Sequence, residues 1–240
     1  MRVDIINKKE DIIPLRLAGK TVVAIDVLRA TSTMAAAFEN GCREVIAVSI
    51  PEEALALKKQ LGAEGVLGGE RKKQKLPGFD FGNSPREYTL EKVNNKILIF
   101  TTTNGTALIN SCIHGQETLI ASFRNAESVV GFLKNKEEVV LACAGTRGTF
   151  SLEDNLLAGY LSLLISREYP SSSLSEGCKS AVNLYKLLEK DIAGILEKTP
   201  HGHGLAVLGL EKDIGYCLEK NKITIVPRVK TRAFYPRIQL

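Results

Sequence analysis

Short apolar segments rich in β-branched residues alternate with helix-like segments along most of this chain. The two kinds differ in period, which is two residues in a strand and about 3.6 in a helix. Strands are predicted at about 3–6, 21–26, 44–48, 65–68, 96–101, 118–121, 138–143 and 223–226. Helices are predicted at about 32–40, 51–61, 106–113, 126–134, 152–167, 175–189, 191–198, 204–210 and 212–219. This alternation predicts an α/β fold of the three-layer α/β/α type, with a largely parallel or mixed central sheet.

No composition shift or Pro/Ser-rich linker divides the chain, although a serine cluster, YPSSSLSEG, precedes a series of predicted helices. We therefore expect one domain over residues 1–240, with a helix-rich C-terminal third that starts at about residue 152. Three helix starts have cap signals. Ser49 to Glu52 matches a capping box with proline in the first turn, and Asn125 and Ser151 are each expected to cap the following helix.

The composition excludes several classes of protein. No apolar stretch approaches the roughly 18 residues that a membrane span requires, and the start, MRVDIINKKE, lacks the pattern of a signal peptide. A cytoplasmic protein without a membrane partner is the expectation. The five cysteines are widely spread and form no CxxC pair, which argues against a disulfide framework or a zinc site.

The net charge of +5 arises largely from two segments, ERKKQK at 70–75 and the tail from Lys220 to Arg237. Basic segments of this kind are usually solvated faces, and no RNA-binding signature with interleaved aromatic residues accompanies them. We expect no nucleic-acid partner. A small anionic substrate suits a modest positive charge equally well.

Three apolar strands each continue into a small, hydroxyl-rich turn: VVAIDV into LRATST, KILIF into TTTNGT, and VVLACA into GTRGT. Ligands of open α/β sheets bind beyond the carboxyl ends of the strands, where small residues admit a close approach and helix amino ends favour anions. Taken singly, such turns are more often ordinary capping sequences. Three at matching positions favour an oxyanion cradle, formed by Thr31, Ser32 and Thr33 on one side and by Thr102, Thr103, Asn104, Gly105 and Thr106 on the other.

Asp26 ends a strand of apolar residues, where a carboxylate is costly unless it is paired or coordinated. It is interpreted as a metal ligand or a nucleophile, or else as the ion-pair partner of Arg29. Four arginines each follow a strand or a glycine-rich turn, and their planar guanidinium groups match phosphate, sulfonate and carboxylate. A substrate with several acidic groups is therefore indicated by Arg29, Arg71, Arg124 and Arg147.

Scattered carboxylates near these turns suit Mg²⁺, which takes one or two carboxylates together with water and substrate phosphate. The candidate ligands are Asp26, Glu70, Glu153 and Asp154. In PHGHG, His201 or His203 could act as an acid or bind phosphate. No Walker P-loop, GxGxxG fingerprint or GxSxG elbow occurs, so nucleotide binding through these motifs and acyl transfer have little support.

Seven ordered motifs, from about residue 22 to about residue 215, resemble the 2-phosphosulfolactate phosphatase family. They are AIDVLRATST, LGGER, FDFGNSP, TTTNGT, SFRNA, ACAGTRGTFSLEDNLLAG and HGHGLAVLGL. The extra histidine in PHGHG departs from the expected HG. The resemblance implies a Mg²⁺-dependent acid phosphatase that converts 2-phosphosulfolactate to 3-sulfolactate, a step towards coenzyme M.

On that reading, the four carboxylates hold Mg²⁺, and Arg29, Arg71 and Arg147 neutralise charge on the phosphoryl oxygens. Water attacks directly, or Asp26 attacks first to form an aspartyl phosphate; the first is preferred because Leu28 stands where haloacid-dehalogenase-type phosphatases carry a second aspartate. Another phosphorylated hydroxy acid as substrate and a non-catalytic anion-binding domain remain as alternatives. The oligomeric state, a homo-oligomer included, is open.

Overall fold

The computed structural model describes residues 1–231 and 235–240 of the chain. Its strands are β1 Arg2–Ile6, β2 Thr21–Ile25, β3 Glu44–Ala47, β4 Gly65–Arg71, β5 Gln74–Lys75, β6 Ile97–Thr101, β7 Glu117–Ala121, β8 Glu138–Cys143, β9 Ser173–Leu174, β10 Arg228–Thr231 and β11 Arg237–Gln239. Its α-helices are α1 Ala30–Glu39, α2 Pro51–Leu61, α3 Leu90–Val93, α4 Gly105–Cys112, α5 Ala126–Phe132, α6 Leu152–Glu168, α7 Glu176–Leu188, α8 Ile192–Glu197, α9 Pro200–Ala206 and α10 Lys212–Leu218.

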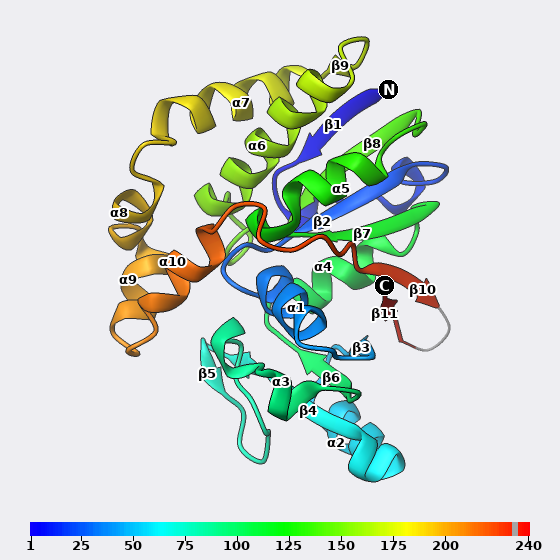
Figure 1. The fold of residues 1–240 in the computed structure, drawn as a ribbon, viewed down its shortest axis with the longest axis vertical. Coiled ribbons are helices and arrows are strands. Elements are labelled where there is room, and N and C mark those ends of the chain that lie inside the picture. The colour runs from blue at the N-terminus through cyan, green and yellow to red at the C-terminus, as the bar shows by residue number, and fades with distance from the viewer. Residues whose placement is uncertain (232–234) are drawn as a thin grey trace.

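The strands form one mixed sheet in the order β5-β4-β6-β3-β11-β10-β7-β2-β8-β1-β9. Two groups are internally parallel, β4-β6-β3 on one side and β7-β2-β8-β1-β9 on the other. Between them lies the β10–β11 hairpin, which pairs antiparallel with β7 and with β3 (Figure 1). The end of the chain therefore joins two groups of strands that come from earlier in the sequence.

Alternate residues of β2 show why helices lie on both faces of the sheet. Val23 and Ile25 belong to a core with residues of α5, α6 and α7, whereas Val22 and Ala24 pack with residues of α1 and α4. Because successive side chains of a strand point to opposite faces, a fully apolar strand requires a cover on each side. The three-layer α/β fold predicted from the sequence is confirmed.

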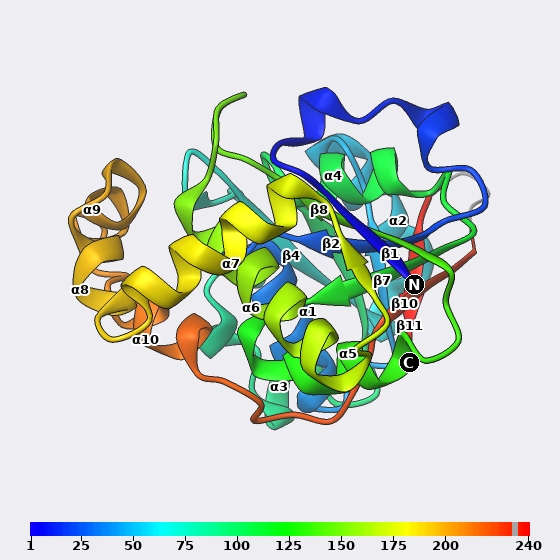
Figure 2. The same ribbon diagram turned by 90° about the horizontal axis from the view of Figure 1, so that it is seen from above.

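The C-terminal helices α8, α9 and α10 group together at one end of the molecule, beside the edge of the main body (Figure 2). They follow α6 and α7, so the described chain from residue 152 to residue 218 is mainly helical, as expected. None of the helices in the described ranges combines the length and the apolar character needed to cross a membrane.

Several local predictions were wrong. No strand forms at 223–226, and the chain becomes a strand only at β10, after Pro227. The helix expected at 204–210 is α9, which begins at Pro200 with Thr199 as its cap. The helix caps differ as well: Ser151 caps α6 as predicted, whereas the side chains of Ser49 and Asn125 make no cap bond to the helices that follow.

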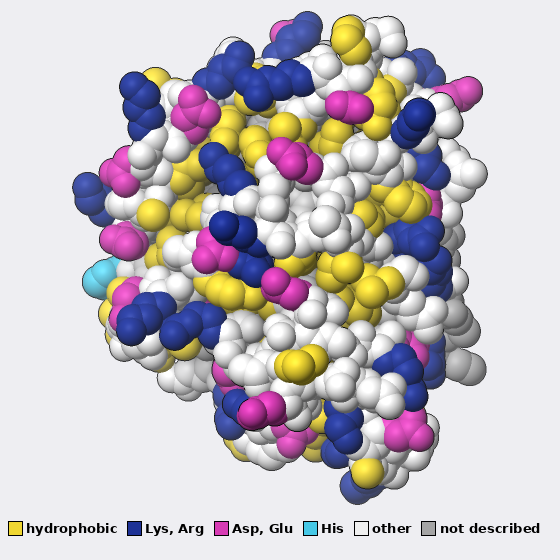
Figure 3. All heavy atoms as spheres, viewed as in Figure 1, with side chains coloured by type: hydrophobic (Ala, Val, Ile, Leu, Met, Phe, Trp, Pro, Cys, Tyr) yellow, Lys and Arg dark blue, Asp and Glu magenta, His cyan; other side chains and the backbone are white. Residues whose placement is uncertain are grey.

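The basic tail is part of the sheet, since Arg228 lies in β10 and Arg237 in β11. Arg237 pairs with Glu44 of β3 at 2.9 Å, and Arg228 lies 3.8 Å from a carboxylate oxygen of Glu117. Arg232, which belongs to the same basic segment, falls outside the described residues. On the face shown in Figure 3, Lys and Arg side chains are interspersed with Asp and Glu, so no broad basic patch forms there.

Candidate active site

A pocket of about 100 Å³ opens at the carboxyl ends of β2, β4, β6 and β8. Its lining comes from segments far apart in the sequence: Asp26, Leu28, Arg29, Glu70, Lys72, Lys73, Asn83, Thr102, Thr103, Asn104, Thr146, Arg147 and His201. The turns after β2, β6 and β8 all reach this pocket. Carboxyl ends of strands are where open α/β sheets bind ligands, and the pocket is therefore the candidate active site.

Asp26 directly follows β2, whose residues are all buried, and its own exposed fraction is only 6%. Its Oδ1 accepts the N–H of Ala30 at 3.2 Å. Burial raises the pKa of Asp26 to about 6; the Ala30 amide and the charge of His201 act against the rise, and the charges of Glu70 and Glu153 add to it. A carboxyl group whose charge changes near neutral pH, at the wall of a pocket, is typical of a functional site.

α4 begins immediately beside Asp26, and Gly105 is the residue that permits this. A Cβ atom at position 105 would lie 2.7 Å from Asp26 Oδ2 and would also collide with the Ala30 side chain. Glycine thus brings the amino end of α4 against the carboxylate wall of the pocket. The amino end of a helix favours an anion, so the placement suits a charged substrate.

Glu70 lies at the end of β4, 6% exposed, with both carboxylate oxygens held by backbone amides. Oε1 accepts the N–H of Thr103 at 2.8 Å, and Oε2 accepts the N–H of Lys73 at 2.7 Å. One side chain therefore links the loop after β6 to the turn between β4 and β5. These bonds fix both loops around the pocket.

Arg29 is buried and paired, but not with Asp26, as one interpretation of the sequence had it. Its NH1 donates to Asp213 Oδ2 at 2.7 Å, and both side chains are almost fully enclosed. Asp213 lies on α10 and also accepts a hydrogen bond of 2.7 Å from the Ser84 hydroxyl. The pair anchors the C-terminal helices against the pocket and leaves Asp26 without an arginine partner among the described residues.

Buried Glu153 and half-buried His201 form a second pair. His201 Nδ1 lies 2.6 Å from Glu153 Oε1, and the imidazole lines the pocket. Burial alone would raise the pKa of Glu153, but the hydrogen bond and charge of His201 outweigh it, and the pKa lies below its usual value. Since Nδ1 is engaged, Nε2 is the ring nitrogen available to a ligand. His203, the other histidine of PHGHG, is exposed and does not line the pocket.

Asp154 is buried behind the pocket, where its carboxylate accepts hydrogen bonds from two backbone amides. Its Oδ1 accepts the N–H of Val27 at 2.8 Å, and its Oδ2 accepts the N–H of Gly145 at 3.2 Å. Burial, together with the charges of Asp26 and Glu153, raises its pKa well above the usual value. The carboxyl group thus ties the loops after β2 and β8 together.

The hydroxyl groups at the start of α1 do not face the pocket, contrary to prediction. Thr31, Ser32 and Thr33 are fully buried and donate to the carbonyl oxygens of residues 26, 27 and 83. Thr106 likewise donates to the Thr102 carbonyl. Because these hydroxyl groups donate to backbone carbonyl oxygens, they stabilise the conformation of the loops and do not contact the pocket. Of the predicted cradle, the pocket wall contains Thr102, Thr103 and Asn104, with Gly105 behind Asp26.

Two of the four predicted arginines also lie away from the pocket. Arg71 donates to the carbonyl oxygens of Glu70 and Ser49. Arg124 is 5% exposed and pairs with Glu39 and Glu219. Arg71 is the last residue of β4 and Arg124 follows β7, but each contributes to structure away from the pocket. Arg147, by contrast, lines the pocket from the tip of the turn between Thr146 and Thr149.

Comparison with known proteins identifies the family of the chain. A family model described as 2-phosphosulpholactate phosphatase matches residues 7–232. The chain belongs to the 2-phosphosulfolactate phosphatase family. Among its relatives are proteins named "Probable 2-phosphosulfolactate phosphatase" from Clostridium acetobutylicum, 40% identical over 95% of this chain and 97% of the relative, and from Thermotoga petrophila, 44% identical over 90% and 91%. A third, from Clostridium novyi, is 39% identical over 99% of both chains.

For this member of the 2-phosphosulfolactate phosphatase family, sequence reasoning missed several pocket residues. Lys72 and Lys73 lie in the basic segment ERKKQK, which was interpreted as a solvated face. Asn83 comes from FDFGNSP, a motif to which no role was given. Asp213, the partner of Arg29, carried no signal at all, because an aspartate in an amphipathic helix is unremarkable in sequence.

The magnesium site that the family implies fits the structure only in part. Neither Glu153 nor Asp154 lines the pocket: Glu153 is engaged by His201, and Asp154 lies behind the pocket wall, where it accepts two backbone amides. In the parts of the chain that the structure describes, no three His, Cys, Asp or Glu side chains are grouped to hold a metal ion. Asp26 and Glu70 are the carboxylates that line the pocket. Two carboxylates suffice for Mg²⁺ when water and substrate phosphate complete its ligands, so this pair fits.

Proposed function

We propose that the protein hydrolyses 2-phospho-3-sulfolactate to 3-sulfolactate and phosphate. The observation that carries the proposal is one pocket, in a chain of this family, that combines two buried carboxylates with a group of cations. The carboxylates are Asp26 and Glu70, and the cations are Arg29, Lys72, Lys73 and Arg147. The substrate bears a phosphate, a carboxylate and a sulfonate, and such a cationic lining neutralises several acidic groups at once.

Asp26 and Glu70 would hold Mg²⁺ at the wall of the pocket. When bound there, the ion would polarise the phosphoryl group as a Lewis acid. The role of the protein residues is to orient the phosphoryl group and to offset its charge, through Arg147 and the amino end of α4. Glu70 also keeps the loop of Thr103 in place, so the same side chain shapes the site and serves the ion.

His201 is the proton donor to the leaving alkoxide in this proposal. Glu153 accepts from Nδ1 and so orients the imidazole, which leaves Nε2 to carry the proton toward the substrate oxygen. A carboxylate that orients a histidine also stabilises the protonated ring, as in other acid–base pairs. Glu153 thus acts through His201 and is a positioning residue.

Water attacks the phosphorus directly in the proposed reaction, and phosphate leaves without a covalent intermediate. Leu28, which lines the pocket two residues after Asp26, offers no second carboxylate for an aspartyl-phosphate route. The oxygen that attacks phosphorus therefore comes from solvent and ends in the phosphate. A phosphoenzyme trapped after rapid acid quench would overturn this part of the proposal.

The decisive experiment measures phosphate release from 2-phosphosulfolactate with Mg²⁺ and with EDTA, for the native protein, Asp26→Asn and the surface control Asp11→Asn. We expect Mg²⁺-dependent turnover that Asp26→Asn reduces at least about 100-fold and that Asp11→Asn leaves unchanged. Release only from another phosphorylated hydroxy acid would mean the named substrate is wrong. Saturable binding without any turnover would favour an anion-binding domain.

A further inference from the structure

The turn between β4 and β5 has an unusual backbone for its sequence. Arg71 of β4 pairs with Gln74 of β5, which leaves Lys72 and Lys73 as a two-residue turn. Both lysines have positive φ angles, 54° and 68°. Two-residue hairpin turns with positive φ at both positions strongly favour Asn-Gly or Gly-Gly. A residue with a side chain costs roughly 1 kcal/mol in this left-handed backbone conformation. Lys72 and Lys73 are therefore unfavourable residues for the backbone conformation of this turn.

Other contacts hold this turn in place against the pocket. The Lys73 amide donates to Glu70 Oε2 at 2.7 Å, and the Lys73 carbonyl accepts from Arg29 NH2 at 3.4 Å. The Lys73 side chain extends to α9, where a Cβ atom added at Gly204 would collide with its Nζ. The turn is therefore fixed to two pocket residues and touches the helix that carries His201. Strained backbone that is held so firmly is typical of functional sites.

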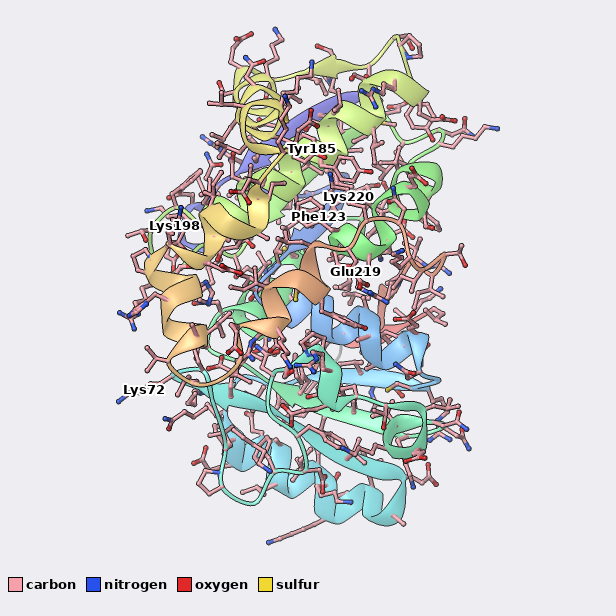
Figure 4. The ribbon with its side chains drawn as sticks, turned by 60° about the vertical axis from the view of Figure 1, so that its left-hand side comes forward. Lys72, Phe123, Tyr185, Lys198, Glu219 and Lys220 are labelled. Carbon is pink, nitrogen blue, oxygen red and sulfur yellow. The ribbon has the colours of Figure 1, made fainter. Side chains whose placement is uncertain are left out.

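In the described parts of the chain, neither lysine is in ion-pair contact with a carboxylate, although the charges of Glu70 and Glu153 act on Lys73 from a distance. Both lysine side chains line the pocket with Arg147 and Arg29. Burial lowers the pKa of Lys73, and the charges of Arg147 and Arg29 lower it further. Figure 4 shows Lys72 at the outer edge of the molecule, below Lys198, the residue that follows α8. An anion placed between these cations would relieve their mutual repulsion.

Asn83 adds a second, independent sign of a ligand. It lines the pocket and is 6% exposed, and within the described chain no hydrogen-bond partner exists for its Oδ1. Buried polar atoms are nearly always bonded, so an unpartnered amide oxygen in a pocket wall indicates a donor that arrives with the ligand. Because Oδ1 only accepts hydrogen bonds, it would meet a bound anion through a water molecule that donates to both.

We propose that the Lys72–Lys73 turn is the subsite for the sulfonate of the substrate, with Lys73 as the main contact and Lys72 at the rim. The phosphoryl group lies toward Asp26 and Glu70, and the sulfonate, on its methylene arm, reaches farthest from the reacting phosphorus. The ammonium groups of the turn meet it there as point charges. This inference rests on the proposed function and names the residues that select a sulfonated substrate.

The test compares 2-phosphosulfolactate with 2-phospholactate, which has a methyl group in place of the sulfomethyl group. For Lys73→Gln, we expect kcat/KM for phosphosulfolactate to fall by about 10- to 100-fold, mainly through KM, and that for phospholactate to change less than about threefold. Lys72→Gln should also lower kcat/KM for phosphosulfolactate more than that for phospholactate, but by a smaller factor than Lys73→Gln. Lys75→Gln, on the same hairpin but outside the pocket lining, is the matched control.

Inhibition by 3-sulfolactate provides an independent readout. Its inhibition constant should rise in Lys73→Gln by a factor similar to that for KM, while inhibition by lactate and by inorganic phosphate stays the same. Equal losses on both substrates, or no loss on either, would overturn the subsite while leaving the phosphatase function intact. A native protein that does not hydrolyse phosphosulfolactate at all would overturn the function and the subsite together.

Discussion

Asp26 lies directly after a buried strand and has no arginine partner among the described residues, whereas Arg29, three residues later, is paired with Asp213 of α10. Glu153 and His201 form a pair of their own. Buried ions are costly unless they are paired, so an unpaired carboxylate in a pocket wall is a candidate for a functional role. At the scale of residues, Asp26 is, in the proposed function, one of the two carboxylates that would bind Mg²⁺.

Asp26→Asn should make the metal-free protein more stable at neutral pH while it abolishes activity. The pKa of Asp26 is about 6 when folded and 3.8 when unfolded, so the folded state holds the proton more tightly. Stability is therefore lost as pH rises from about 4 to 6, by up to about 3 kcal/mol. We expect urea unfolding in EDTA at pH 7.5 to show a gain of about 1–3 kcal/mol for the variant.

The gain should shrink toward zero near pH 3, below both pKa values, because the folded and the unfolded state of the native protein then both carry most of the proton. The exposed control Asp11→Asn should change stability little at either pH, since surface pairs contribute about 0–1 kcal/mol. A gain that is equal at both pH values would show that the pKa of Asp26 is the same in the folded and the unfolded state.

His201→Asn should matter only when the leaving group needs a proton. Loss of the donor is expected to reduce turnover of 2-phosphosulfolactate by about 100- to 10,000-fold, because an alkoxide leaves poorly without protonation. Turnover of p-nitrophenyl phosphate, whose phenolate leaves unaided, should fall far less. Glu153→Gln should likewise reduce turnover of 2-phosphosulfolactate more than that of p-nitrophenyl phosphate, but by a smaller factor. His203→Asn is the control and should leave both rates unchanged. Equal losses on both substrates would argue against proton donation by His201.

At the scale of elements, the pocket depends on how closely α4 approaches β2. The loop after β6 turns into α4 at Gly105, against Asp26 and Ala30, and reciprocal bonds between Thr102 and Thr106 shape that turn. The helix thus begins at the wall of the pocket. Its position is set by the absence of a side chain.

Gly105→Ala is expected to destabilise the protein by about 1–3 kcal/mol and to reduce activity, because its methyl group displaces either α4 or Asp26. Gly131→Ala is the matched control, since a Cβ atom there, in α5, meets nothing within 4 Å. That change should stabilise by about 0.5–1 kcal/mol through helix propensity. Urea unfolding and phosphate release measure both variants, and equal behaviour of the two would contradict the close approach.

At the scale of the whole molecule, the C-terminal hairpin of β10 and β11 completes the sheet between β3 and β7. Ile238 of β11 is fully buried in the core that includes Val45 of β3 and Ile120 of β7. The hairpin therefore couples the two groups of parallel strands that together form the pocket. A change that destabilises the hairpin should therefore destabilise both groups of strands.

Ile238→Ala is expected to cost about 2–5 kcal/mol, the usual cost of a large cavity in a core. In hydrogen exchange, amides of β3 and β7 should lose protection together, because the hairpin bonds to both. Leu240→Ala, at a residue that is 52% exposed, is the control and should have little effect. Loss of protection confined to β3 would show that the two groups are stable independently.

Local patterns in the sequence were enough to predict the order of most strands and helices, the layered α/β fold and the turns that reach the pocket. These depend on side-chain period and turn chemistry among near neighbours, which a sequence displays directly. Asp26, Glu70 and Arg147 were found because each directly follows a strand or a glycine-rich turn. The family resemblance added the chemistry that such turns serve.

Only the tertiary structure determined which charged side chains pair with one another. Arg29 and Asp213 are 184 residues apart, and Glu153 and His201 are 48 apart, so no local pattern joins them. The same holds for Arg71 and Arg124, which lie at or just after the end of a strand yet bond away from the pocket, and for a C-terminal hairpin inserted between much earlier strands. Burial and long-range pairing set the role of a charged side chain, and both arise only when distant segments pack.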